Sequence, residues 1–352
     1  MPGFTTHYVF GIRAFFQCQD GVLKEMIKDN RDLYRIGLQG PDMFFCHPRA
    51  SIGAQERNIG SNMHELQVNE YFRQCFLYME NLPKSKIPLA ASYVAGFLVH
   101  YVLDSMIHPY IYSRVGYVPN KKKGSKQVSG AHANLETMID WWILKYYKGE
   151  DAKRFRKSFT LFLSEYHTHF LCNFLADTIN ATYYKDSYKR LVTSKRKENS
   201  RINERLFTFK NGNPYKINEQ FVKNTLRLFR IECNALHDVT GRKKRYVEMI
   251  ENHTLKYPLI SAMIYPKIEP NKHNIFNLGH YEWTNPWDRT IKSNQSLIEL
   301  FALSKNRCQS IFEVFEIYLK ALISGQEYVA QRELLLACIG NDSYHSGLDC
   351  DL

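Results

Sequence analysis

The sequence lacks the short motifs by which many hydrolases and nucleotide-binding enzymes are identified. It contains no HExxH, no GxSxG and no glycine-rich phosphate-binding loop, which argues against a zincin protease, an α/β-hydrolase and a P-loop enzyme. It also has no internal repeat and no series of segments that alternate apolar and polar residues. Apolar residues instead recur with helical spacing along nearly the whole chain, so we predict an all-α fold.

Two further absences concern the cellular location. None of the eight cysteines forms a CxxC pair, and most lie within apolar helical patterns, so we expect reduced thiols. The first residues, MPGFTTH, lack the basic and apolar regions of a secretion signal. Both features favour a cytoplasmic protein. The most hydrophobic stretch, residues 87–112, contains two histidines, an aspartate and two prolines, which favours a buried core helix over a membrane span.

Positive charge is in excess. The formal net charge is +12 at pH 7 and the pI is about 9.2, which favours anionic partners such as phosphate esters, lipid headgroups or nucleic acid without choosing among them. A chain of 352 residues can bury one large core or two smaller ones. We expect a helical domain over residues 1–190 and a helical C-terminal region over residues 191–352 that packs on the same core. The polar, basic residues 194–205 are the predicted exposed connection.

The apolar periodicity places the main helices. They are predicted over residues 22–34, 60–82, 88–108, 131–147, 218–234 and 296–324, with one or two more over residues 152–184. Gly40-Pro41-Asp42 is a predicted break, and Pro109 is expected to end the third helix. Residues 258–288 contain turns, prolines and aromatic residues. The loop before residue 130 carries Lys121, Lys122, Lys123 and Lys126, which we interpret as solvated, with binding of an anionic headgroup as the alternative.

The segment from His100 to His108 has the pattern HxxxDxxxH. Residues four apart lie nearly above one another on a helix, so His100, Asp104 and His108 share one stripe. In so apolar a helix, three ionisable side chains on a single stripe are costly unless a partner satisfies them. A divalent cation would satisfy all three together. The alternative is a set of buried histidines hydrogen-bonded to Asp104.

A second helix strengthens the metal interpretation. His132 and Glu136 are again four residues apart and follow the first pattern after a single loop. Imidazole and carboxylate groups are the usual zinc ligands outside thiolate sites. His64 and Asp42 would be ligands contributed by two further segments. The pair His237-Asp238 resembles the adjacent pair of HD phosphohydrolases, but the other ligands of that fold are missing around it, so we interpret it as a surface pair.

The order of these motifs resembles the zinc-dependent phospholipase C family of bacteria, which is related in fold to the fungal single-strand nucleases. The resemblance covers about residues 1–145 and implies a multi-helix bundle with its metal site in a cleft. The matching stretches are Thr6-His7-Tyr8, Gly37-Leu-Gln-Gly-Pro-Asp42, Met63-His64, Gly96 to Asp104, His108-Pro109 and His132 to Glu136.

The resemblance also implies a ligand set. One zinc ion would be held by Asp42, His64, His100 and Asp104, and a second by His108, His132 and Glu136. A third would use His7 and a bridging Asp104. In that family the free amino terminus of the mature chain completes the third site, a role that Pro2 could take here after removal of Met1.

The implied activity is zinc-dependent hydrolysis of a phospholipid or a smaller phosphodiester. The resemblance assigns the general base to Asp42, and attack by a hydroxide generated at the metals is the rival mechanism. Two other functions stay open, a single-strand nuclease with the same metals and a metal-stabilised binding protein without activity. The expected partners are a phospholipid or other phosphodiester, with an anionic membrane surface next and nucleic acid less favoured. The oligomeric state stays open.

Overall fold

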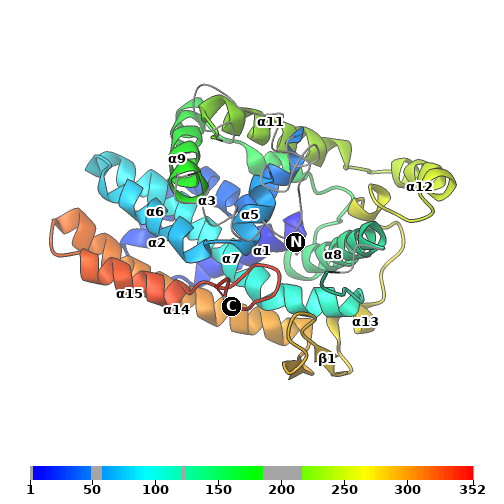
Figure 1. Ribbon diagram of the computed structural model, residues 1–352. Helices are drawn as coiled ribbons and strands as arrows, with labels where there is room; N and C mark the ends of the chain where they lie inside the picture. Colours follow the sequence, from blue (N-terminus) through cyan, green and yellow to red (C-terminus); the bar gives the residue numbers. More distant parts are fainter. Residues whose placement is uncertain (1–2, 49–57, 121–123, 185–215, 352) are drawn as a thin grey trace, which may run out of the picture.

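The computed structural model describes residues 3–48, 58–120, 124–184 and 216–351. Its helices surround one long central helix, as Figure 1 shows. The α-helices are α1 (Phe4–Gln17), α2 (Val22–Asp29), α3 (Arg31–Gly37), α5 (Ile59–Glu65), α6 (Val68–Glu80), α7 (Ile87–Arg114), α8 (Ser125–Lys148), α9 (Glu165–Tyr183), α11 (Glu219–Ala235), α12 (Arg242–Thr254), α13 (Lys272–Phe276), α14 (Leu297–Ser324) and α15 (Val329–Ile339).

Shorter elements complete the fold. The 3-10 helices are η1 (Gly40–Cys46), η3 (Lys84–Lys86), η4 (Lys157–Leu161) and η5 (Ser261–Met263). Two strands, β1 (Trp283–Thr284) and β2 (Lys292–Ser293), form an antiparallel pair in which Trp283 is opposite Ser293. Since every other named element in the described ranges is a helix, the predicted all-α fold is confirmed. All eight cysteines are free, as predicted.

The central helix α7 forms the core of the molecule. It contacts α1, α2, α3, α6, α8, α9 and α14, and nearly all its side chains are buried. It is long and apolar enough to cross a membrane, yet 94% of its most apolar window is buried inside the protein. The residues of this helix therefore pack as a protein core, as predicted for residues 87–112.

The prediction that Pro109 ends this helix is wrong. Pro109 has no N–H to donate to the carbonyl of Ser105, which normally breaks a helix. Here Gly347 lies against the Ser105 carbonyl, so closely that a Cβ on residue 347 would come within 2.4 Å of the oxygen. The next two residues, Tyr110 and Ile111, are buried, and the Tyr110 hydroxyl donates to the carbonyl of Ile275 at 2.8 Å. Tertiary packing therefore carries α7 on to Arg114.

Two predicted helices are each divided in two. Residues 22–34 form α2 and α3, which meet at Asn30, whose side-chain amide donates to the carbonyl of Met26 at 2.9 Å. Such local bonds let an Asn side chain compete with the helical backbone. Residues 60–82 form α5 and α6, which meet at Gln67, with a φ of +51°. The left-handed conformation of that residue ends one helix and redirects the chain into the next.

The helices after residue 216 pack against the earlier ones. The long helix α14 contacts α1, α2 and α7, while α15 contacts α6, and α11 contacts α9 and η1. After α15 the chain returns to the centre of the molecule, where its last residues lie near α5 and α7 (Figure 1). The predicted connection at 194–205 and the three lysines at 121–123 lie outside the described residues.

Candidate metal centre

The stripe predicted on α7 faces the interior. His100, Asp104 and His108 are each fully buried, so water does not solvate their polar atoms. The carboxylate of Asp104 lies between the two imidazoles. One of its oxygens is 3.1 Å from Nε2 of His100 and 3.8 Å from Nδ1 of His108. Asp104 is thus the centre of the cluster.

Asp42 reaches the cluster because of the turn that precedes it. Gly40 has a φ of +50°, a conformation that a glycine adopts without strain, and a Cβ there would come within 2.2 Å of the His100 ring. Pro41 then starts the short helix η1. The predicted break at these residues therefore brings the Asp42 backbone close to α7.

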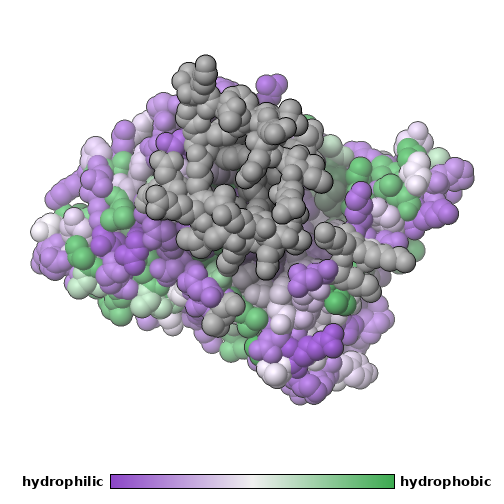
Figure 2. All heavy atoms as spheres, viewed as in Figure 1, coloured by the Kyte–Doolittle hydropathy of each residue, from purple (hydrophilic) through white to green (hydrophobic). Residues whose placement is uncertain are grey.

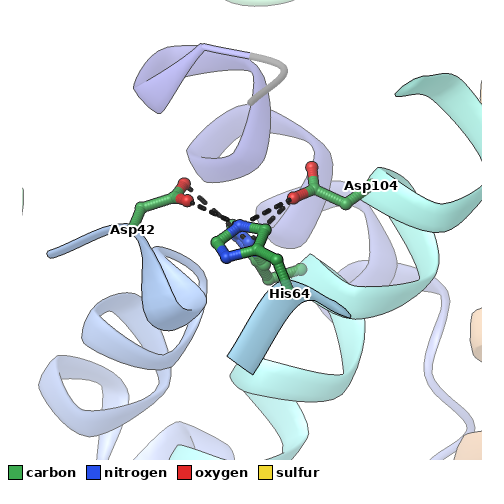
Figure 3. Close-up of side chains that lie close together, drawn as sticks. Asp42, His64 and Asp104 are labelled. Carbon is green, nitrogen blue, oxygen red and sulfur yellow. Dashed lines mark ion pairs between the residues drawn. The ribbon is translucent and has the colours of Figure 1, made fainter. Parts of the chain in front are cut away.

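His64 approaches from α5. Asn58 caps this helix by accepting a hydrogen bond from the backbone of Ser61 at 3.0 Å. Nε2 of His64 lies 3.2 Å from one oxygen of Asp42 and 3.8 Å from one oxygen of Asp104. Figure 3 shows the two carboxylates on either side of the imidazole. Together with His100 these residues form the first ligand group, whose ligand atoms lie within 4.8 Å of one another.

The second ligand group is built by α7 and α8. His108, His132 and Glu136 offer ligand atoms that again lie within 4.8 Å of one another. One oxygen of Glu136 is 2.6 Å from Nε2 of His132 and 3.4 Å from Nε2 of His108. The sequence spacing that predicted a shared helix face therefore holds for both α7 and α8.

His7 joins the cluster from α1. Its Nε2 is 3.0 Å from one oxygen of Asp104, whereas His64 approaches the other oxygen. The His7 ring stacks on that of His100, with centroids 3.9 Å apart. The structure thus places His7 beside Asp104, where the resemblance implies a third ion. Pro2 lies outside the described residues.

The remaining imidazole nitrogens are fixed by backbone carbonyls. Nδ1 of His64 is 2.6 Å from the carbonyl of Gly60, and Nδ1 of His100 is 3.1 Å from that of Leu38. A carbonyl only accepts, so each Nδ1 carries the proton and each Nε2 keeps its lone pair for a cation. Nδ1 of His108 is likewise 2.7 Å from a carbonyl, that of Tyr344.

The donor atoms of the cluster fit a bound cation. Both oxygens of Asp42 and Asp104 and the Nε2 atoms of His64, His100 and His108 are buried and have no aligned hydrogen bond among the described residues. Leaving such a polar group unsatisfied costs about 1–3 kcal/mol. Ligand atoms around a tetrahedral zinc are separated by about 3.3 Å, given bonds of roughly 2.0–2.1 Å, which is close to the separations seen here.

The ionisation states of the cluster residues also fit a bound cation. Burial opposes the ionisation of Asp104, but the surrounding histidines outweigh it and hold the pKa of this carboxyl well below its usual range. Burial lowers the pKa of His108 and His132, so these imidazoles stay in the neutral form that binds a metal. Burial also raises the pKa of Glu136 well above its usual value, and a nearby cation would oppose that shift.

The sequence did not reveal that the C-terminal segment belongs to the centre. Besides supplying the carbonyl for His108, Tyr344 donates its backbone N–H to the carbonyl of His64 at 2.9 Å. The next residue, His345, stacks on the His64 ring with centroids 5.0 Å apart and places Nδ1 3.2 Å from Glu65. The only signal of this role in the sequence is the pair Tyr344-His345, which stands alone in an otherwise polar C-terminal segment.

Asp140 was also missed as a support of the site. This fully buried carboxylate on α8 accepts hydrogen bonds from the backbone N–H groups of Thr5 and Thr6, at 3.1 and 2.7 Å, and from the Thr6 hydroxyl. The N-cap residue of α1 makes no side-chain cap, so Asp140 performs that function from another helix. His7 follows directly and is held in place by this contact.

Asp140→Ala is therefore expected to destabilise the protein by about 3 kcal/mol, because it leaves the Lys157 ammonium, 3.4 Å away, and the first turn of α1 without their buried partner. Urea unfolding measures the change. The control Glu150→Ala removes an exposed carboxylate paired with Lys148 and should change stability by less than about 0.5 kcal/mol. Equal stability of Asp140→Ala and the wild type would show that the cap contributes nothing.

The pair His237-Asp238, interpreted from the sequence as a pair on a helix surface, lies instead in the turn that follows the end of α11 at Ala235. The carboxylate of Asp238 accepts hydrogen bonds from the backbone N–H groups of Gly241 and Lys244, at 2.9 and 2.8 Å. Asp238 therefore organises the turn that leads into α12.

A family model for zinc-dependent phospholipase C matches residues 6–202. The match covers more than half of the chain and includes both ligand groups and His7. Neither a curated protein nor a solved structure matches the sequence. The family match and the converging buried ligands agree, and the chain belongs to the zinc-dependent phospholipase C family.

Proposed function

We propose that the protein is a zinc-dependent hydrolase that cleaves the phosphodiester of a phospholipid into diacylglycerol and a phosphorylated headgroup. The observation that carries this proposal is the pair of buried His/carboxylate groups, which share the helix α7 and meet at Asp104. Membership of the family supports the reaction class, and the net charge of +12 suits an anionic substrate.

Two zinc ions are the proposed cofactors, with His7 and Asp104 as the start of a third site. When bound, zinc makes water acidic enough to act as a nucleophile near neutral pH and neutralises the charge of a phosphate. The histidines hold their Nε2 lone pairs towards the site because their Nδ1 protons bind carbonyls. This arrangement presents neutral donors without any proton having to move.

Asp42 is the proposed general base. Neither of its oxygens accepts an aligned hydrogen bond among the described residues, so the carboxylate does not cap η1, the short helix on which it lies. One oxygen lies 3.2 Å from Nε2 of His64, and the other lies 3.8 Å from Nε2 of His100. A carboxylate held between two imidazoles can accept the proton of an attacking water on one of its oxygens.

An aromatic cluster beside the second ligand group favours a second candidate function, hydrolysis of single-stranded nucleic acid. The centroid of the Tyr112 ring lies 4.5 Å from that of His132 and 4.9 Å from that of Trp287. Tyr117 in turn lies 4.9 Å from Trp287. Aromatic side chains stack on bases. The rings of Tyr112 and Trp287 meet edge to face, however, at 84°, so this pair offers no parallel stacking surface.

A substrate panel tests the proposal. The purified full-length protein is analysed for bound metals and then assayed on phosphatidylcholine, phosphatidylserine, bis(p-nitrophenyl) phosphate and single-stranded DNA. We expect diacylglycerol and a phosphorylated headgroup from at least one phospholipid. Cleavage of DNA alone would replace lipid by nucleic acid as the substrate, and inactivity of the zinc-loaded protein on every substrate would favour a binding protein.

A further inference from the structure

The helix α12 projects from the body of the molecule, at the right of Figure 1. Glu251 is its only fully buried residue, and its main contact is with the short helix η5. It lies beyond residue 202, where the match to the family model ends. Two features are unusual for a surface helix: a buried charged residue holds α12 to the protein, and apolar side chains of α12 are exposed to solvent.

Polar side chains hold α12 to the protein. The carboxylate of Glu251 accepts hydrogen bonds from the backbone N–H groups of Leu259 and Ile260, at 3.1 and 2.6 Å, and from the Ser261 hydroxyl. The ammonium of Lys244, on the same side of the helix, donates to the carbonyl of Ser261 at 2.7 Å. The inward face is thus charged and hydrogen-bonded.

Apolar side chains cover the outward face. Tyr246, Met249 and Ile250 are 62%, 59% and 43% exposed, and their spacing places them on one stripe. Surface helices normally bury their apolar stripe against the core, so α12 has the reverse arrangement. Apolar and hydrophilic side chains appear together on this projecting part in Figure 2. Further exposed apolar residues lie nearby in the sequence, namely Val239, Leu255, Ile260 and Ile268.

Cations flank the apolar stripe. A hollow between the first turns of α12 and the segment 266–268 is lined by Arg242, Lys244, Arg245 and Lys267, with Glu248 as its acidic member. Arg242, Arg245 and Lys267 are exposed, so their charges face solvent. A basic helix with a solvent-facing apolar stripe is the pattern of segments that lie in the surface of an anionic membrane.

We infer that α12 docks the protein on a bilayer that contains anionic phospholipids. Tyr246, Met249 and Ile250 would enter the interface between headgroups and acyl chains, while the exposed cations Arg242, Arg245 and Lys267 would bind lipid phosphates. This inference rests on the proposed phospholipase function and adds to it a membrane surface and the helix that binds it.

The position of α12 relative to the metal centre suits such docking. The segment that follows it packs on α8, where a Cβ at Gly130 would come within 2.0 Å of the Pro258 carbonyl. Gly130 lies two residues before His132, a member of the second ligand group. Lys126, one turn before Gly130 on α8, is exposed. Docking through α12 therefore brings the lipid surface close to α8, the helix that carries two of the three members of the second ligand group.

Vesicle sedimentation of the full-length protein tests the inference. The vesicles consist of phosphatidylcholine alone or of phosphatidylcholine mixed with phosphatidylserine. We expect binding to the anionic vesicles, and a loss of that binding at about 1 M salt, where the screening length is about 3 Å. The double variant Tyr246→Ser/Met249→Ser should bind at least about tenfold more weakly, because two apolar side chains no longer enter the interface.

Two controls make the outcomes separable. The double variant Ile317→Ser/Leu334→Ser, which changes exposed apolar residues of α14 and α15, should bind like the wild type. Hydrolysis of bis(p-nitrophenyl) phosphate should be equal in all of these proteins, since α12 contributes no ligand to the metal centre. Unchanged vesicle binding by the α12 variant, or no binding by the wild type, overturns the inference. Vesicle binding without hydrolysis of any phosphodiester overturns the proposed function and leaves the docking helix supported.

Discussion

Asp104→Ala is expected to abolish zinc binding in the first ligand group and to lower phosphodiester hydrolysis by roughly a thousandfold or more. Asp104 is the carboxylate on which the cluster converges, since His7, His64 and His100 all place an Nε2 atom within 3.8 Å of it. Bound metals contribute several kcal/mol of transition-state stabilisation, and each 1.4 kcal/mol is a factor of ten in rate. Elemental analysis of the purified variant measures the metal, and an assay on bis(p-nitrophenyl) phosphate measures the rate.

A surface aspartate provides the matched control. Asp20 precedes α2, is 97% exposed and pairs with Lys24 at the surface, where an ion pair contributes little, so Asp20→Ala should keep both the zinc and the activity. Circular dichroism separates loss of metal from loss of the fold. A folded Asp104→Ala protein that carries the same zinc content as the wild type would contradict the assignment of Asp104 as the central ligand.

The sequence predicted the parts of the centre that depend on local geometry. The spacing of four residues in α7 and α8 determines which side chains share a helix face, and both patterns converge as expected. Asp42 and His64 came instead from the resemblance, because neither has a ligand partner in its own segment. Their meeting with Asp104 depends on how η1 and α5 pack against α7.

The supports of the centre could not be predicted in the same way. Asp140 caps a helix that lies about 135 residues earlier in the chain, although its position four residues after Glu136 was a signal that it shares the inner face of α8. The Tyr344 carbonyl orients His108 through a backbone atom, so the contact leaves no trace in residue type. Long-range packing also explains why α7 continues past Pro109, since the neighbours of that turn come from residues 275 and 347.

Two helix boundaries were not predicted because the residues that form them carry no strong sequence signal. Asn30 and Gln67 interrupt segments whose apolar periodicity is nearly continuous, and neither residue is a strong helix breaker. The break at Asn30 is stabilised from outside, because its carbonyl accepts a hydrogen bond from the Ser92 hydroxyl of α7 at 2.8 Å. Periodicity identifies the face that will be buried, while the tertiary contacts of a few polar groups decide where each helix stops.

Asp42→Asn is expected to keep most of the bound zinc and to lower the rate of hydrolysis by roughly two to four orders of magnitude. The amide keeps one oxygen near His64 and His100 but accepts a proton far less readily than a carboxylate, and removing a general base costs about that factor. Because Asp42 is 2% exposed and Gly40 fits tightly against His100, the nearly isosteric asparagine should leave the local packing intact.

The measurement that separates a base from a ligand is the comparison of Asp42→Asn with Asp42→Ala. Both variants lack the base and should lose at least that factor in rate, whereas only the alanine removes the oxygen ligand, so it should also lower the zinc content of the first group and lose further rate with it. Rates on bis(p-nitrophenyl) phosphate and zinc content are determined on the same preparations. If Asp42→Asn retains full activity with its zinc, the attacking water is deprotonated without Asp42. If it loses zinc as completely as the alanine variant, Asp42 acts first as a ligand and its loss of rate no longer reports on a base.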